Sequence, residues 1–175
     1  RGESVIDKPA FSAAMKRRRC LVPADGFYEW KAIGTGKQPY YVRAKSGAPL
    51  AFAGLWETWT GPNGEEMETA AIVTTRANRT LAGIHERMPV VVPPEAFNMW
   101  LDCANIDDKT AASLIAPASD DLLEAYEVST AVNRTANDDP KLIERDFEPV
   151  EAQPATRVRQ QATRAKKDDG QGVLF

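Results

Sequence analysis

Residues 19–31, RCLVPADGFYEWK, decide the fold, because they predict two short strands on either side of an Asp25-Gly26 turn. The same alternation of apolar segments and turn residues predicts further strands at residues 39–45, 49–59, 67–77, 89–92 and 124–130. Helical patterns are fewer and local, at residues 7–19, 93–102 and 107–116. The predicted class is therefore α+β, a single compact domain on a mostly antiparallel, barrel-like sheet with a few peripheral helices.

Glu29 is the residue of this stretch whose role the pattern leaves open. In an extended segment the side chains alternate, so Glu29 shares a face with Phe27, and Tyr28 and Trp30 share the other. In one interpretation the Tyr/Trp face packs on the core and Glu29 is exposed, as glutamates usually are. In the other, Glu29 faces a cleft and acts as an acid or a base.

Turn and capping residues predict where several elements begin and end. Asn63-Gly64 within GPNGEE predicts a hairpin loop. Asp7 and Asp107 are the expected N-caps of two helices, and Asn78 caps the short connector after the strand at 67–77.

Composition and charge limit the classes of protein that the chain can belong to. Its 175 residues are 43% hydrophobic and 27% charged, which is ordinary for a globular domain. No run of about 18 apolar residues and no secretory leader occur, so we expect a cytoplasmic protein that is not inserted in a membrane. From about residue 151 the apolar content falls, so residues 1–150 form the expected domain and residues 151–175 a disordered tail.

The net charge of −3 is unevenly distributed. Residues 151–175 hold five bases and three acids, a net charge of +2, so that −5 remains for residues 1–150. The domain therefore lacks the overall positive charge that is typical of many nucleic-acid-binding proteins. Two local basic patches remain candidates for nucleic-acid binding, namely the tail and the run Lys16 to Arg19. Most such runs are solvated helix ends.

Two cysteines and a single histidine are the side chains most able to carry chemistry. Cys20 and Cys103 lack metal-ligand spacing, so we expect free thiols and neither a metal nor a cofactor. Cys20 lies in a predicted strand, where it is either buried and inert or a thiol nucleophile. His85 lies in a connector between strands, where binding sites are frequent, and it could form an acid/base pair with Glu29.

Several blocks in a fixed order identify a resemblance. They are RGES at the start, RCLVPADGFYEWK, GLWE, IVTTRAN, IHERMPVVV and VSTAVNRTANDDPKLI. From Arg1 to about Glu144 the chain resembles the SOS response-associated peptidase (SRAP) family. The resemblance implies a DNA damage response protein that binds single-stranded DNA and becomes covalently attached to abasic sites. It also implies removal of the initiator Met by the protein itself, which exposes the cysteine that forms the crosslink as a thiazolidine.

The resemblance assigns roles to five residues of this chain. Glu29 and His85 match the catalytic glutamate and histidine, which transfer protons during N-terminal processing, sugar ring opening and crosslink reversal or strand elimination. Arg1 and Arg87 match arginines that hold DNA phosphates. Thr74 matches a polar residue that lines the same site.

The family's nucleophilic cysteine and an active-site asparagine precede the RGES block and so lie outside this sequence. Either upstream residues are not included here, or the chain is a truncated product that binds DNA weakly and without chemistry. The Cys20 alternative, a thiol peptidase that acts on other proteins, also stays open. We expect a monomer.

The C-terminal residues QGVLF resemble the peptide by which bacterial repair proteins dock on the replicative sliding clamp. Gln171, Leu174 and Phe175 are the expected contacts, because two large apolar side chains at the end of a flexible arm can fill a pocket. The alternative is an ordinary apolar C-terminus. A clamp-tethered DNA-binding module without catalytic chemistry is a further open interpretation.

Overall fold

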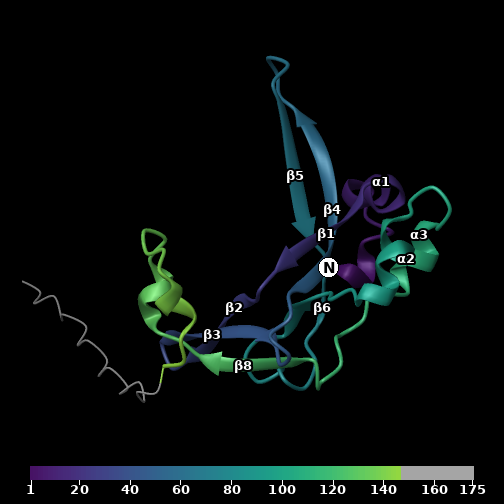
Figure 1. Cartoon of the computed structure of the whole chain (residues 1–175). Helices are drawn as coiled ribbons and strands as arrows, with labels where there is room; N and C mark the ends of the chain where they lie inside the picture. Colours follow the sequence, from purple (N-terminus) through teal and green to yellow (C-terminus); the bar gives the residue numbers. More distant parts are fainter. Residues whose placement is uncertain (147–175) are drawn as a thin grey trace, which may run out of the picture.

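The computed structural model describes residues 1–146, which form antiparallel sheets with a few short helices (Figure 1). One sheet has the order β1 (Arg19–Ala24), β4 (Leu50–Thr60), β5 (Glu66–Ile72). The second has the order β2 (Phe27–Ile33), β3 (Gly36–Ala44), β8 (Leu123–Glu127), and a two-stranded ribbon joins β6 (Thr74–Arg76) to β7 (Arg87–Pro89). The predicted α+β class is confirmed. The predicted tail with Gln171, Leu174 and Phe175 lies outside the described residues.

The strands β1 and β2 follow each other in sequence but belong to different sheets, so the Asp25-Gly26 step does not close a hairpin. Strand β1 pairs with β4, and β2 pairs with β3. Gly26 is required for another reason. A Cβ atom there would lie 2.5 Å from the Tyr41 ring and 2.5 Å from the carbonyl oxygen of Val42. Close approach to β3 therefore explains the glycine.

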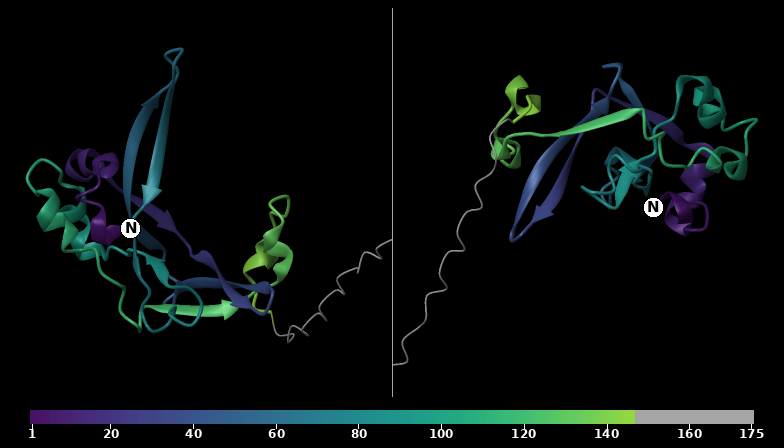
Figure 2. Two further views of the ribbon diagram at one scale, coloured as in Figure 1. Left: turned by 180° about the vertical axis from the view of Figure 1, so that it is seen from behind. Right: turned by 90° about the horizontal axis from the view of Figure 1, so that it is seen from below.

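Two genuine hairpins join neighbouring strands. The β2–β3 turn contains Gly34 at φ 56°, and the predicted β4–β5 loop contains Gly64 at φ 84°, a left-handed conformation that favours glycine. The β4–β5 hairpin projects from the rest of the chain, with Trp59 and Met67 exposed on it (Figure 2). The single strand predicted at 67–77 is divided at Val73 into β5 and β6.

Three short α-helices gather on one side of the β1–β4–β5 sheet (Figure 1). They are α1 (Pro9–Arg17), α2 (Phe97–Leu101) and α3 (Asp108–Ala112). The 3-10 turns are η1 (Gly2–Ser4), η2 (Pro94–Ala96), η3 (Thr130–Asn133) and η4 (Pro140–Ile143). Met15 and Trp100 are fully buried between these helices and the sheet. None of the helices within residues 1–146 has the length and apolar character needed to cross a bilayer.

The predicted caps have mixed outcomes. Asp107 caps α3, because its side chain accepts a hydrogen bond from the Thr110 amide. Asn78 accepts one from the Leu81 amide at 3.1 Å. The Asp7 prediction is wrong, because α1 begins after Lys8 without a side-chain cap.

The basic run before β1 is not a four-residue patch, because two of its arginines are engaged. Arg19 is only 4% exposed and donates hydrogen bonds to four carbonyl oxygens, those of Met15, Trp100, Asp102 and Ile106. Arg18 forms an ion pair with Glu57 on β4. Arg19 is thus a structural residue that ties α1, α2 and the following loop to β1.

Candidate active site

Glu29 and His85, which are distant in sequence, lie side by side in the structure. Glu29 Oε1 is 3.7 Å from His85 Nδ1. Strand β2 carries the glutamate, and the histidine lies two residues before β7. The predicted acid/base pair is therefore present as a geometric feature.

The main chain of Arg87 orients the His85 ring. Its amide donates to Nδ1 at 3.1 Å, and its carbonyl oxygen lies 3.0 Å from the same nitrogen. Within residues 1–146 all of these contacts involve Nδ1, so Nε2 is left for proton exchange. The side chain is 41% exposed, which gives a substrate access to it.

Glu29 lies on the inward face of β2, so the interpretation of Glu29 as an exposed acid is wrong. Its side chain is 20% exposed, and Phe27 on the same face packs edge-on against Phe52 at 5.6 Å. Burial raises the pKa of Glu29, and the neighbouring His85 acts in the opposite direction. A half-buried carboxyl beside an imidazole is an arrangement suited to general acid–base chemistry.

The opposite face of β2 is also packed. Tyr28 lies 5.3 Å from the Tyr41 ring, and Trp30 donates from Nε1 to Asn133 Oδ1 at 2.7 Å. The expectation that Tyr28 packs on the core is confirmed, because it packs against the buried cluster of Tyr41, Tyr126 and Val128.

Tyr40 and Glu127 continue the row that begins at Glu29, and the sequence did not identify them. Glu29 pairs with Tyr40 across β2 and β3, and Tyr40 pairs with Glu127 across β3 and β8. The Tyr40 hydroxyl donates to Glu127 Oε1 at 2.7 Å. Burial, together with this carboxylate, raises the pKa of Tyr40 to about 12, so the phenol keeps its proton. Strand register, which a single sequence does not show, places Tyr40 beside Glu29 and Glu127 one strand further on.

Arg87 forms the centre of a second cluster on the β6–β7 ribbon. It donates from Nη1 and Nη2 to the two oxygens of Glu3 at 2.7 and 2.8 Å, and from Nη2 to the Thr74 carbonyl at 2.6 Å. The Thr74 hydroxyl is a weaker contact at 3.4 Å. The hydrogen bonds from Arg87 lower the pKa of Glu3 to about 2. The structure thus brings the predicted Arg87 and Thr74 together and adds Glu3, to which the sequence assigned no role.

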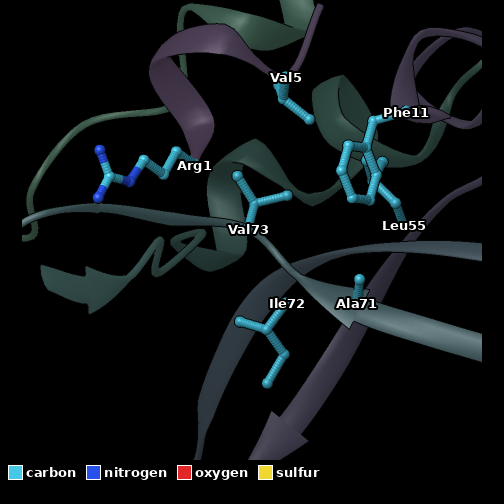
Figure 3. A pocket seen from close by; sticks show the side chains of 7 residues that line it. All are labelled: Arg1, Val5, Phe11, Leu55, Ala71, Ile72 and Val73. Carbon is cyan, nitrogen blue, oxygen red and sulfur yellow. The ribbon is translucent and has the colours of Figure 1, made fainter. Parts of the chain in front are cut away.

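Arg1 lies apart from these contacts. Its stem lines a small cavity of about 50 Å³ with Val5, Phe11 and Val73, among others, and its guanidinium points away from the cavity (Figure 3). The group is exposed at the start of η1.

Cys20 is unsuited to act as a nucleophile. It lies in β1, on the sheet that contains neither Glu29 nor the His85 connector, and burial raises the pKa of its thiol. A Cβ atom at Gly54 would lie 2.8 Å from Cys20 Sγ, which shows how closely the strand β4 covers it. These features argue against the thiol peptidase alternative. Within residues 1–146 no group of three or more His, Cys, Asp or Glu side chains is arranged to hold a metal ion.

Comparisons with known proteins agree with the resemblance. The family model for "SOS response associated peptidase (SRAP)" matches residues 1–135. The chain is 41% identical over 145 residues to the abasic site processing protein YoqW of Bacillus subtilis, covering 82% of this chain and 65% of that protein. It is 34% identical over 161 residues to the abasic site processing protein HMCES of Xenopus tropicalis, covering 81% of this chain and 48% of that protein.

Solved structures give the same result for the fold. A crystal structure of a protein from Bacteroides thetaiotaomicron superposes with a TM-score of 0.77 at 30% identity, covering 83% of this chain and 64% of that chain. The chain therefore spans about two-thirds or less of the length of these relatives.

Proposed function

Because the chain belongs to the SOS response associated peptidase family, we propose that it processes abasic sites in DNA, as the names of its relatives say of those proteins. The observation that supports this most directly is the Glu29–His85 contact at 3.7 Å. It provides a proton-exchange pair beside the strand that holds Arg87, where a phosphate could be bound.

The proposed chemistry is condensation of an aminothiol with the aldehyde of the ring-opened abasic sugar. The amine attacks the carbonyl carbon, water leaves, and the resulting imine accepts the sulfur while the thiol proton moves to nitrogen, giving a thiazolidine. Each step moves a proton, which Glu29 and His85 are positioned to exchange. The aminothiol is the N-terminal cysteine that the family resemblance places upstream of Arg1. Glu29 also serves the removal of the initiator Met.

The DNA is proposed to be single-stranded. Its backbone passes the ribbon side of the site, where Arg1, Arg87 and Thr74 offer cationic and polar groups. Docking of Gln171, Leu174 and Phe175 on a sliding clamp remains a separate proposal. The protein is proposed to act as a monomer in the cytoplasm.

The test uses the natural-length protein that begins Met-Cys, incubated with a single-stranded oligonucleotide containing one abasic site. We expect an adduct that survives denaturing electrophoresis and is absent with an intact oligonucleotide. The 175-residue chain, which does not begin with cysteine, is expected to bind the oligonucleotide without an adduct. If the natural-length protein forms no adduct, the crosslinking function is refuted.

A further inference from the structure

The guanidinium of Arg87 is already occupied by an internal anion. An arginine has five N–H donors, and a phosphate is held best by two parallel ones. Arg87 directs one donor from each terminal nitrogen to Glu3 and a second from Nη2 to the Thr74 carbonyl. Its Nε is buried without a partner among the described residues. The two parallel donors of Arg87 that a phosphate would use, on Nη1 and Nη2, are therefore already bound to Glu3.

The backbone that carries Glu3 is held firmly. Gly2 is buried, and a Cβ atom there would lie 2.2 Å from Ile115 Cγ2 and 3.0 Å from the Thr74 carbonyl oxygen. Val5, on the other side of Glu3, is 4% exposed and belongs to the core. The η1 turn therefore stays in place beside the ribbon.

The end of the Glu3 side chain, in contrast, is open to water. It is 51% exposed, while the Arg87 side chain is 19% exposed. Water can solvate the carboxylate if it rotates away, so the cost of separating it from Arg87 is limited. A fixed backbone with an exposed carboxylate is the arrangement that allows exchange for another anion without unfolding the turn.

We propose that Glu3 is the resident anion of the phosphate site, and that a DNA phosphate reaches Arg87 by displacing the Glu3 carboxylate. This inference rests on the proposed DNA-binding function. Glu3 then determines affinity, because the phosphate must replace a two-oxygen ligand and remains near the displaced negative charge. Arg87 contributes less to DNA binding than a free arginine would.

The test compares Glu3→Gln with Glu57→Gln in the 175-residue chain, using a fluorescent single-stranded oligonucleotide over a range of salt concentrations. The two variants are matched. Each removes one acid whose side chain is about half exposed, 51% for Glu3 and 50% for Glu57, and each frees one arginine, Arg87 or Arg18. Circular dichroism checks that both are folded.

For Glu3→Gln we expect tighter binding than in the parent protein at each salt concentration, because the phosphate contacts Arg87 in both proteins but displaces no carboxylate in the variant. The expected gain in affinity is up to about fivefold, which corresponds to the strength of an exposed ion pair. Glu57→Gln should match the parent protein. An unchanged affinity in Glu3→Gln, or equal changes in both variants, overturns the proposal.

A second measurement needs no variant and separates this inference from the proposed function. The Glu3 carboxyl of the parent protein is followed by carbon NMR during an acid titration, with and without saturating oligonucleotide or inorganic pyrophosphate. Displacement predicts that its pKa rises from about 2 toward the ordinary value of 4.5 when either anion binds. If the parent protein does not bind the oligonucleotide, the proposed function fails. The displacement of Glu3 is then tested by the titration with pyrophosphate alone. A pKa that stays near 2 with either anion bound overturns the exchange.

Discussion

Glu3 and Glu29 contact two residues of the same short segment, Arg87 and His85, and their pKa values are shifted in opposite directions. Glu3 is bound through both oxygens by Arg87, and its pKa is lowered to about 2. Glu29 is half-buried, its pKa is raised, and its partner is the histidine His85 at 3.7 Å. One carboxylate contacts a guanidinium and the other an imidazole.

This difference in pKa suits the two carboxylates to different chemical functions. A carboxylate with a lowered pKa stays ionised and binds cations, so Glu3 suits charge compensation. Burial raises the pKa of Glu29, which favours its protonated form, so Glu29 suits proton transfer. Burial and the identity of the partner thus give two glutamates opposite pKa shifts.

The largest expected difference between the two carboxylates is kinetic. In the natural-length protein, Glu29→Gln should slow adduct formation with abasic DNA by about 10²-fold or more, since a positioned acid or base contributes about 10²–10⁴-fold. Glu3→Gln should change the rate by less than about tenfold. Single-turnover gel assays measure both rates. Equal losses would remove the distinction between a proton-transfer residue and a charge-compensating one.

Removal of each basic partner should affect stability to different extents. Arg87→Met leaves the Thr74 carbonyl without its donor, whereas water can solvate the exposed Glu3 carboxylate, so we expect a loss of about 1–2 kcal/mol in the free energy of unfolding. His85→Ala removes a ring that is 41% exposed and should cost less than about 1 kcal/mol. Urea denaturation tests the pair, and a larger loss for His85→Ala contradicts the comparison.

The two carboxylates should respond to pH with opposite signs. The folded-state pKa of Glu3 is lowered from 4.5 to about 2, so its stabilisation is present above pH 4.5 and is lost as the pH falls toward 2. The folded-state pKa of Glu29 is raised, so its favourable contribution is present below 4.5 and is lost as the pH rises through the raised pKa.

Urea denaturation of the parent, Glu3→Gln and Glu29→Gln between about pH 2 and pH 8 measures both contributions. Glu3→Gln should be less stable than the parent above pH 4.5, and this difference in the free energy of unfolding should disappear toward pH 2. Glu29→Gln should instead become more stable relative to the parent as the pH rises above 4.5. Parallel pH profiles in the two variants would show that the environments do not differ.

The smallest expected effect is that of Thr74→Val. The Thr74 carbonyl, at 2.6 Å from Arg87 Nη2, is the main contact, whereas the hydroxyl lies at 3.4 Å. We therefore expect a change below about 1 kcal/mol in the free energy of unfolding. A loss of more than about 2 kcal/mol would show that the Thr74 side chain, and not its main chain, orients Arg87.

Local signals in the sequence predicted local structure well. Asp107 as a cap and Gly64 in a hairpin depend on neighbouring residues only, and both were found as predicted. The partners of β1 and β2 were not predicted, because Asp25-Gly26 is a typical hairpin signal whereas Gly26 here serves close packing on Tyr41. Long-range pairing decides the sheet order, and a single sequence does not show it.

The sequence predicted which two side chains could pair, but not the residues that contact them or lie next to them in the sheet. The resemblance identified Glu29 and His85, and the structure places them in contact. The Glu3–Arg87 pair joins residues 84 apart in sequence, and the Tyr40–Glu127 hydrogen bond joins residues 87 apart. Charged and hydroxyl side chains usually lie at the surface, so composition offered no sign of these partnerships.

The buried Arg19 has a consequence for how the protein opens. It binds carbonyl oxygens at the end of α1, at the end of α2 and in the loop before α3, all from one side chain on β1. None of these segments can detach without breaking hydrogen bonds in a buried site. In hydrogen-exchange experiments the three helices should therefore behave as one cooperative unit, whereas amides at the tip of the projecting β4–β5 hairpin should exchange first.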